Sequence, residues 1–195
     1  MRLVYTALLV IALGAVVYAL ASAAGGPQSA SKLERFAVDD LAGLDFSQAG
    51  TPASDAPFTD ATGAQISLAD FRGKTILVNF WATWCGPCER EMPHLGALQT
   101  ARGSDTFEVV AISVDSRDDE AYARERLDEL TGSTLAFTHA PPDAWDVVYG
   151  SGATGFPTTV IYGPDGMEIA RLRGEADWSA SLALGFLDAI MAGSA

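Results

Sequence analysis

The sequence predicts an α/β domain of three layers, in which helices cover both faces of a central mixed sheet. Residues 75–81, 107–114 and 158–162 form nearly unbroken apolar runs rich in β-branched and aromatic residues, which is typical of strands buried on both faces of a sheet. Helical patterns separate these runs, so crossover connections are expected between strands. The Pro-Asp-Gly turn at 164–166 leads into residues 168–173, which predicts a final antiparallel pair.

The bulk composition indicates one domain with an appendage and argues against a nucleic-acid partner. The chain has 195 residues and a formal net charge of −13. A length of about 100–200 residues is usual for a single domain. An acidic chain offers no basic patch for a phosphate backbone, so we expect no nucleic-acid partner.

The first 24 residues differ from the rest of the chain. No charged residue occurs from Leu3 to Ala24, and this run is long enough for a membrane span, which needs about 20 apolar residues. We expect residues 1–24 to form an inner-membrane anchor, with Arg2 on the cytoplasmic side. Two Ala-x-Ala patterns, at 19–21 and 21–23, leave open a cleaved signal peptide and a soluble exported chain.

The remaining chain divides into an extension and a domain. Residues 25–52 are expected to be a linker and N-terminal extension, containing a Gly/Pro/Ser tether and then a short amphipathic helix over 32–42. Residues 53–193 are expected to form the domain, which begins with a hairpin from Phe58 through Leu68. The helices of the domain are expected at residues 87–101, 120–130, 143–149 and 179–191.

The two cysteines of the chain, Cys85 and Cys88, stand together in a Cys-Gly-Pro-Cys loop. Cys85 follows a predicted strand and opens a predicted helix, whose N-terminal dipole and free N–H groups stabilise a thiolate. The thiolate attacks disulfides, so Cys85 is the candidate nucleophile and Cys88 the candidate resolving thiol. The i, i+3 spacing brings both sulfurs within disulfide reach. Pro87 suits the first helical turn, and Gly86 leaves room for a partner's disulfide.

Two other interpretations of the cysteine pair remain open. A zinc or copper site would need further ligands, for which His94 and His139 are the available histidines. An inert structural disulfide would close a very small loop and remove little chain entropy.

These residues resemble a known family. The Trp-Cys-Gly-Pro-Cys sequence at 84–88 resembles the thioredoxin active site, and residues 68–74 leading into 78–85 are similar to the TlpA/ResA branch of thioredoxin-like proteins. The resemblance covers about residues 53–191, and the segment 174–178 looks closest to TlpA. It implies a thioredoxin-like fold with an N-terminal hairpin and a central insertion, preceded by one transmembrane or signal helix.

The resemblance also implies a substrate-binding surface beside the cysteines. Pro157 matches the family's cis-proline, which would leave the N–H and C=O of Phe156 free to pair with an extended substrate peptide. Trp84 would contact partners, together with Gly86 and Pro87. The alternative is that Pro157 is an ordinary turn proline.

A further implied residue is Glu91. Thioredoxins carry a buried aspartate where this chain has Asn79, and TlpA/ResA proteins instead use a glutamate three residues after the second cysteine, which matches Glu91. Glu91 would then relay a proton to or from the thiols as a third catalytic residue. The alternative is an exposed glutamate favoured by the helix dipole.

The resemblance implies a periplasmic protein-disulfide reductase without a cofactor. Its partners would be a membrane electron donor and cysteine-containing proteins of cytochrome c or cytochrome oxidase assembly, including copper-centre proteins. Two alternatives remain: a non-enzymatic metal-holding or peptide-binding assembly factor, and a general disulfide oxidant.

Overall fold

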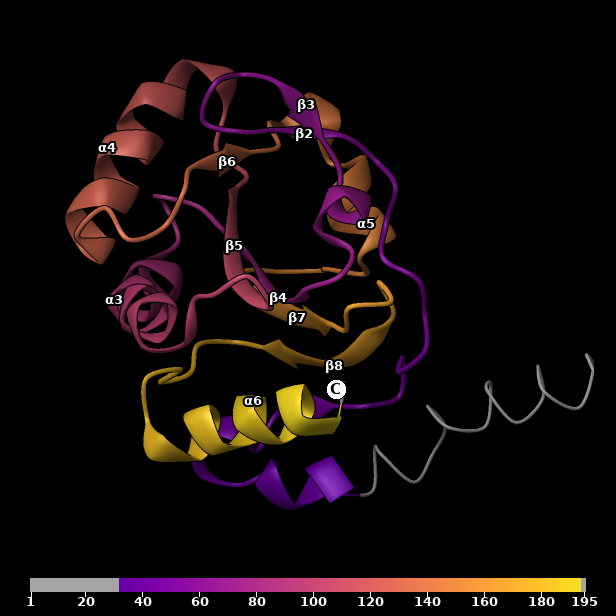
Figure 1. The fold of residues 1–195 in the computed structure, drawn as a ribbon. Coiled ribbons are helices and arrows are strands. Elements are labelled where there is room, and N and C mark those ends of the chain that lie inside the picture. The colour runs from indigo at the N-terminus through magenta and orange to yellow at the C-terminus, as the bar shows by residue number, and fades with distance from the viewer. Residues whose placement is uncertain (1–31, 194–195) are drawn as a thin grey trace, which may run out of the picture.

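The computed structural model describes residues 32–193, which fold around one mixed sheet (Figure 1). The strand order across the sheet is β1-β8-β7-β4-β5-β6-β2-β3. The strands are β1 (Leu44–Asp45), β2 (Phe58–Thr59), β3 (Gln65–Ile66), β4 (Thr75–Trp81), β5 (Phe107–Ser113), β6 (Thr138–His139), β7 (Thr158–Tyr162) and β8 (Glu168–Arg173). The helices are α3 (Gly86–Arg102), α4 (Glu120–Thr131), α5 (Asp146–Gly150) and α6 (Ser181–Gly193), with 3-10 turns η1 (Glu34–Phe36), η2 (Asp39–Leu41), η3 (Leu68–Phe71), η4 (Arg117–Asp119) and η5 (Pro142–Ala144).

The predicted mixed sheet is confirmed, and its centre is β4. This strand pairs in parallel with β5, where Trp81 lies opposite Ser113, and antiparallel with β7, where Phe80 lies opposite Thr158. The predicted antiparallel pair of β7 and β8 is also present. The end of β4, the end of β5 and the beginning of β7 therefore meet at one edge of the sheet, where the site described below lies.

Helices cover both faces of the sheet, as predicted. Asn79 of β4 points to the face covered by α3, because its amide nitrogen reaches Glu91 of that helix. Arg171 of β8 points to the opposite face, where it donates a hydrogen bond to the carbonyl of Gly152, just beyond α5. Figure 1 accordingly shows α6 on one side of β7 and β8, and α5 on the other.

The N-terminal hairpin and the central insertion are both present. The hairpin pairs β2 with β3, with Phe58 opposite Ile66. The insertion lies between β5 and β7 and contains α4, β6 and α5. Strand β6 was not predicted, because two residues are too few to show a periodic pattern. It extends the sheet by pairing in parallel with β5.

The described part of the extension packs against the domain. The prediction of one amphipathic helix over 32–42 is wrong, because Val38 adopts an extended conformation that separates η1 from η2. The Phe36 ring lies 5.6 Å from that of Phe186 in α6, centroid to centroid. Strand β1 then pairs with β8 at the edge of the sheet.

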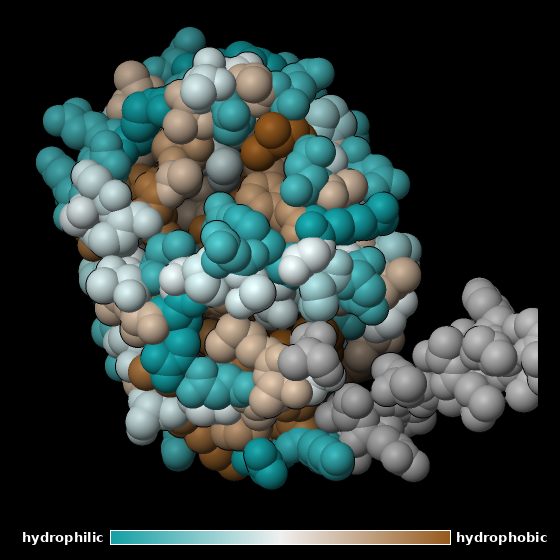
Figure 2. Space-filling model, viewed as in Figure 1, coloured by the Kyte–Doolittle hydropathy of each residue, from teal (hydrophilic) through white to brown (hydrophobic). Residues whose placement is uncertain are grey.

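The predicted anchor or signal segment, residues 1–24, and the tether at 25–31 lie outside the described residues. Among residues 32–193, no helix has both the length and the apolar character that crossing a membrane requires. Figure 2 shows a face of the molecule on which hydrophilic residues predominate and hydrophobic residues occur in separate patches.

Candidate active site

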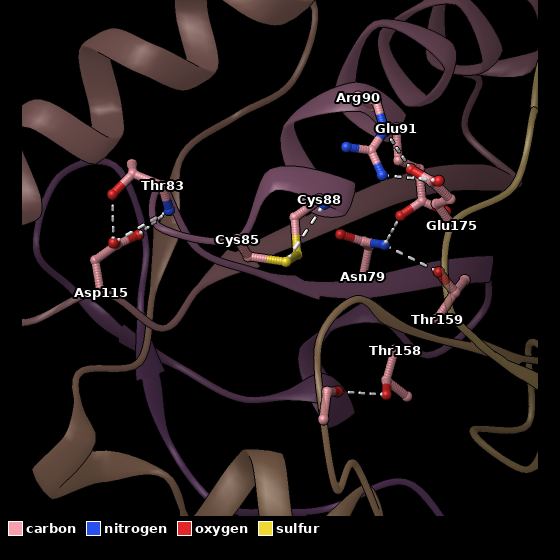
Figure 3. The surroundings of a disulfide bond; sticks show 11 residues. Asn79, Thr83, Cys85, Cys88, Arg90, Glu91, Asp115, Thr158, Thr159 and Glu175 are labelled. Atoms are coloured by element: carbon pink, nitrogen blue, oxygen red, sulfur yellow. Dashed lines mark hydrogen bonds and ion pairs between the residues drawn. A yellow bond between two sulfur atoms is a disulfide. The ribbon is translucent and has the colours of Figure 1, made fainter.

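The two cysteines lie at the junction of β4 and α3, where they form a disulfide with a Cα–Cα distance of 5.2 Å (Figure 3). Cys85 is the N-cap residue of α3, and its sulfur accepts a hydrogen bond from the backbone N–H of Cys88 at 3.3 Å. The Cys85 residue is 7% exposed, whereas Cys88 is fully buried. Of the two, only Cys85 can be reached from solvent, and it is also the sulfur that faces the helix N-terminus.

The Phe156–Pro157 peptide bond is cis, as the resemblance implied. It immediately precedes β7, whose first residue Thr158 lies opposite Phe80 of β4. Because β4 runs on from Phe80 toward the cysteines, this pairing brings Phe156 and Pro157 to the edge of the sheet that carries the disulfide.

A series of aromatic rings extends from the disulfide loop onto α5. The Trp84 ring is in edge-to-face contact with Phe156 at 5.8 Å, Phe156 with Trp145 at 5.7 Å, and Trp145 with Tyr149 at 6.0 Å. The two end residues are largely exposed, Trp84 at 63% and Tyr149 at 66%. We refer to these four residues, Trp84, Phe156, Trp145 and Tyr149, as the aromatic row. The last two belong to the central insertion and were not predicted as site residues.

Glu91 is buried beneath α3, at 1% exposure, and not on the surface of the helix. Its Oε1 accepts hydrogen bonds from the Trp178 indole at 2.6 Å and from the Ala176 backbone N–H at 3.2 Å. Its Oε2 accepts one from the Asn79 side-chain amide at 2.9 Å. Figure 3 shows Asn79 between the Glu91 carboxylate and the disulfide. The alternative of an exposed helix-start glutamate is therefore excluded.

Burial raises the pKa of Glu91 to about 7. Desolvation of the carboxylate is the largest cause, and the nearby charge of Glu175 adds to it. The hydrogen bonds from Trp178, Asn79 and Ala176 oppose the rise, because they stabilise the charged form. A carboxyl group that titrates near neutral pH can both accept and donate a proton, as general acid–base chemistry requires.

The segment joining β8 to α6 packs along α3. Arg90 forms a two-point ion pair with Glu175, with both N–O distances at 2.9 Å. His94 lies 3.1 Å from the Ser179 hydroxyl and 3.0 Å from Asp177. We call residues 175–179 the latch segment, because it contacts α3 through residues on each side of Glu91 and supplies two of that residue's three hydrogen bonds.

A buried aspartate holds the loop before Cys85. The side chain of Asp115, which is fully buried, accepts hydrogen bonds from the Thr83 backbone N–H at 3.1 Å and from the Thr83 hydroxyl at 2.7 Å. Asp115 follows β5 and Thr83 follows β4, so the parallel pairing of these strands places them side by side. Asp115 was not among the predicted site residues, although an aspartate just past the end of a buried strand is a detectable signal.

The two histidines considered as metal ligands have other contacts. His94 binds the latch segment, and the Nε2 of buried His139 lies 2.9 Å from the backbone oxygen of Asp115. Within residues 32–193, no group of three or more His, Cys, Asp or Glu side chains is arranged to hold a metal ion.

Comparison with known proteins agrees with this geometry. Residues 49–167 match the AhpC/TSA family. The thiol-disulfide oxidoreductase ResA of Bacillus thuringiensis subsp. konkukian is 32% identical over 126 residues, which cover 65% of this chain and 70% of that protein. ResA of Geobacillus thermodenitrificans is 33% identical over 117 residues, which cover 60% of this chain and 64% of that protein.

Solved structures share the fold. The thioredoxin domain of a thiol-disulfide oxidoreductase from Bacteroides vulgatus has a TM-score of 0.60 and 26% identity, covering 73% of this chain and 97% of its own. A DsbF homologue from Corynebacterium diphtheriae has a TM-score of 0.58 at 23% identity, covering 75% of this chain and 92% of its own, and it supports the fold alone. The chain therefore belongs to the AhpC/TSA family, has a thioredoxin-like fold, and is a thiol–disulfide oxidoreductase.

Proposed function

We propose that the protein reduces disulfides of partner proteins, with Cys85 as the attacking thiol and Cys88 as the resolving thiol. The observation that supports this order most directly is the difference between the two sulfurs. Cys85 caps the N-terminus of the 17-residue helix α3 and is partly accessible, whereas Cys88 is fully buried. A helix N-terminus stabilises a thiolate, and the thiolate is the attacking species.

The reaction proceeds in two exchanges. The Cys85 thiolate attacks one sulfur of the partner's disulfide, forming a mixed disulfide and releasing the partner's other sulfur as a thiolate. Cys88 then loses its proton, for which Glu91 is the proposed acceptor, and its thiolate attacks the Cys85 sulfur. The Cys85–Cys88 bond forms, the bond to the partner breaks, and the partner leaves with both of its cysteines reduced. A membrane electron donor would return the protein to its dithiol form.

The substrate-binding surface in this proposal comprises Trp84, Gly86, Pro87, Phe156 and Pro157. Trp84 and Phe156 are in ring contact, and the cis bond before Pro157 lies at the sheet edge that carries the disulfide. A partner peptide would lie in extended form beside Phe156 and use its backbone groups.

We further propose that the protein works in the periplasm, held at the inner membrane by residues 3–24 or released after cleavage. The resemblance to the TlpA/ResA branch supports partners in cytochrome c or cytochrome oxidase assembly. Whether the protein reduces or oxidises its partners depends on the reduction potential of its cysteine pair. A potential near that of thioredoxin, about −270 mV, fits a reductant, and a much higher potential fits an oxidant.

The test is reduction of insulin disulfides by the full chain with excess dithiothreitol. The wild-type chain should accelerate the reaction, and Cys85→Ser should abolish the acceleration. Cys88→Ser should trap the partner on Cys85 as a mixed disulfide that mass spectrometry identifies. Full activity of Cys85→Ser, or tight stoichiometric binding of copper or zinc by the reduced chain, would instead favour the metal-holding alternative.

A further inference from the structure

The side-chain oxygen of Asn79 has no hydrogen-bond partner among the described residues, whereas its side-chain nitrogen donates two hydrogen bonds. The residue is fully buried in the middle of β4. Its Nδ2 donates to Glu91 Oε2 at 2.9 Å and to Thr159 Oγ1 at 2.9 Å. This arrangement suits the ionised form of Glu91, which can only accept: the amide nitrogen faces the carboxylate, and Oδ1 faces the other way.

The free Oδ1 atom points toward the disulfide. Within the described part of the chain, it is one of four buried side-chain nitrogen or oxygen atoms that lack a hydrogen-bond partner. Figure 3 shows this oxygen on the side of Asn79 that faces the two sulfurs. Cys88 and Glu91 are three residues apart on α3 and thus share one face of the helix. Asn79 contacts this face of α3 at Glu91, so Cys88 also faces the part of β4 that contains Asn79.

An acceptor without a donor is disfavoured in a protein core, yet the oxidised site offers none. The sulfurs of a disulfide carry no hydrogen. Reduction adds two electrons and two protons to the Cys85–Cys88 bond and creates an S–H group on Cys88. Because Cys88 is fully buried, desolvation favours its neutral thiol, and that thiol is a hydrogen-bond donor.

We propose that Asn79 is a positioning residue that recognises the reduced state, by accepting a hydrogen bond from the Cys88 thiol through Oδ1 while it holds the Glu91 carboxylate through Nδ2. Asn79 itself takes no proton. In the resolving step, the proton leaves Cys88 for Glu91, the Cys88 thiolate attacks Cys85, and the partner's sulfur departs with the electron pair. The Asn79 amide thus stabilises the dithiol form relative to the disulfide and holds the Glu91 carboxylate beside the Cys88 thiol.

This inference rests on the proposed function only in naming Cys88 as the resolving thiol, and its test needs no physiological partner. The full chain is equilibrated with reduced and oxidised glutathione at fixed pH, and the dithiol fraction is measured by alkylation and mass spectrometry. Asn79→Leu is close in volume and removes the acceptor. We expect it to shift the equilibrium toward the disulfide by about five- to tenfold, as loss of one hydrogen bond and of one unpaired oxygen implies.

Thr159→Val is the matched control. It removes the other hydrogen bond of the same amide, at an equally buried position, but leaves Oδ1 in place. We expect its equilibrium to stay within about twofold of wild type, because a single neutral hydrogen bond common to both redox states cancels in the comparison. An unshifted Asn79→Leu equilibrium, or an equal shift in Thr159→Val, would overturn the proposal.

A second measurement uses the unaltered protein, so it does not depend on folding of the variants. The side-chain carbonyl carbon of Asn79 is followed by NMR in the oxidised and reduced chain. Formation of the hydrogen bond predicts a downfield shift on reduction, whereas an unchanged resonance contradicts it. Failure of insulin reduction with a positive NMR result would reject the proposed function and leave this inference standing.

Discussion

The indole N–H of Trp178 donates a hydrogen bond to Oε1 of Glu91, and the two atoms are 2.6 Å apart. Trp178 lies 87 residues further along the chain and is fully buried. The latch segment therefore has a role besides joining β8 to α6, since it donates a hydrogen bond to the carboxyl group that is proposed to accept the proton of Cys88.

Replacing Trp178 by Phe should raise the pKa of Glu91 further above its present value of about 7. The indole stabilises the charged carboxylate, so its loss favours the protonated form by about one pKa unit, as expected for a hydrogen bond to a charged group. The pH dependence of turnover should shift to higher pH by the same amount. Trp81→Phe is the matched control, because the Trp81 indole is buried without a hydrogen-bond partner among the described residues. Equal shifts in both variants would show that the indole bond is not the cause.

Glu91 should make the oxidised protein less stable as the pH rises. Its folded-state pKa of about 7 lies above the ordinary value of 4.5, so the folded state binds the proton more tightly than the unfolded state. The stabilisation is present below about pH 4.5 and is lost as the pH rises through 7. Urea unfolding should show that wild type loses up to about 3 kcal/mol more than Glu91→Gln between these limits. The same slope in both proteins would mean that Glu91 titrates normally.

Removal of the Thr83 hydroxyl should loosen the loop before Cys85. Thr83→Val removes the 2.7 Å hydrogen bond to Asp115, at a cost of about 1 kcal/mol in the free energy of unfolding. It should also increase amide hydrogen exchange at residues 83–85. Thr138→Val removes a different hydroxyl, which is buried and donates to the Ala111 carbonyl, and should cost about as much without affecting exchange in that loop. Unchanged exchange in Thr83→Val would show that Asp115 does not hold the loop.

The outer end of the aromatic row should contribute to the binding of protein substrates and not to the reaction with small disulfides. Tyr149→Ser removes an exposed ring that contacts Trp145. We expect the KM for insulin to rise about three- to tenfold, as loss of one aromatic contact suggests, and the rate with hydroxyethyl disulfide to stay unchanged. Tyr122→Ser removes a comparably exposed ring from α4, on the opposite side of the view in Figure 1. An equal effect of both variants would indicate nonspecific loss of surface apolarity.

The parts of the fold with long, strongly patterned segments were predictable from the sequence. Strand β4 was predicted with its bounds, because seven consecutive residues that are all buried give a clear apolar run. Strand β6 was missed, because Thr138–His139 is recognised as a strand through its pairing with β5 and β2, which are distant from it in the sequence. The helix expected over 32–42 failed because its apolar spacing reflects contacts such as Phe36 with Phe186, which no local pattern reveals.

In the candidate site, too, residues marked by a local pattern were predictable, and residues placed by contacts distant in the sequence were not. Cys85, Cys88 and the cis Phe156–Pro157 bond were predicted, because a local motif or a family resemblance identifies them. Trp178 was passed over, since its contact with Glu91 depends on how the latch segment crosses α3. Only the three-dimensional arrangement brings such distant residues together.

The measurement that tests the central claim most directly is alkylation of the reduced chain by iodoacetamide across pH, with the two cysteines resolved by mass spectrometry. If the N-terminus of α3 activates Cys85, this residue should react at a pH well below that of a free thiol, whose pKa is about 8.5, while Cys88 reacts only at higher pH. Reaction of Cys85 with the pH dependence of a free thiol, or earlier reaction of Cys88, would contradict the proposed order of attack.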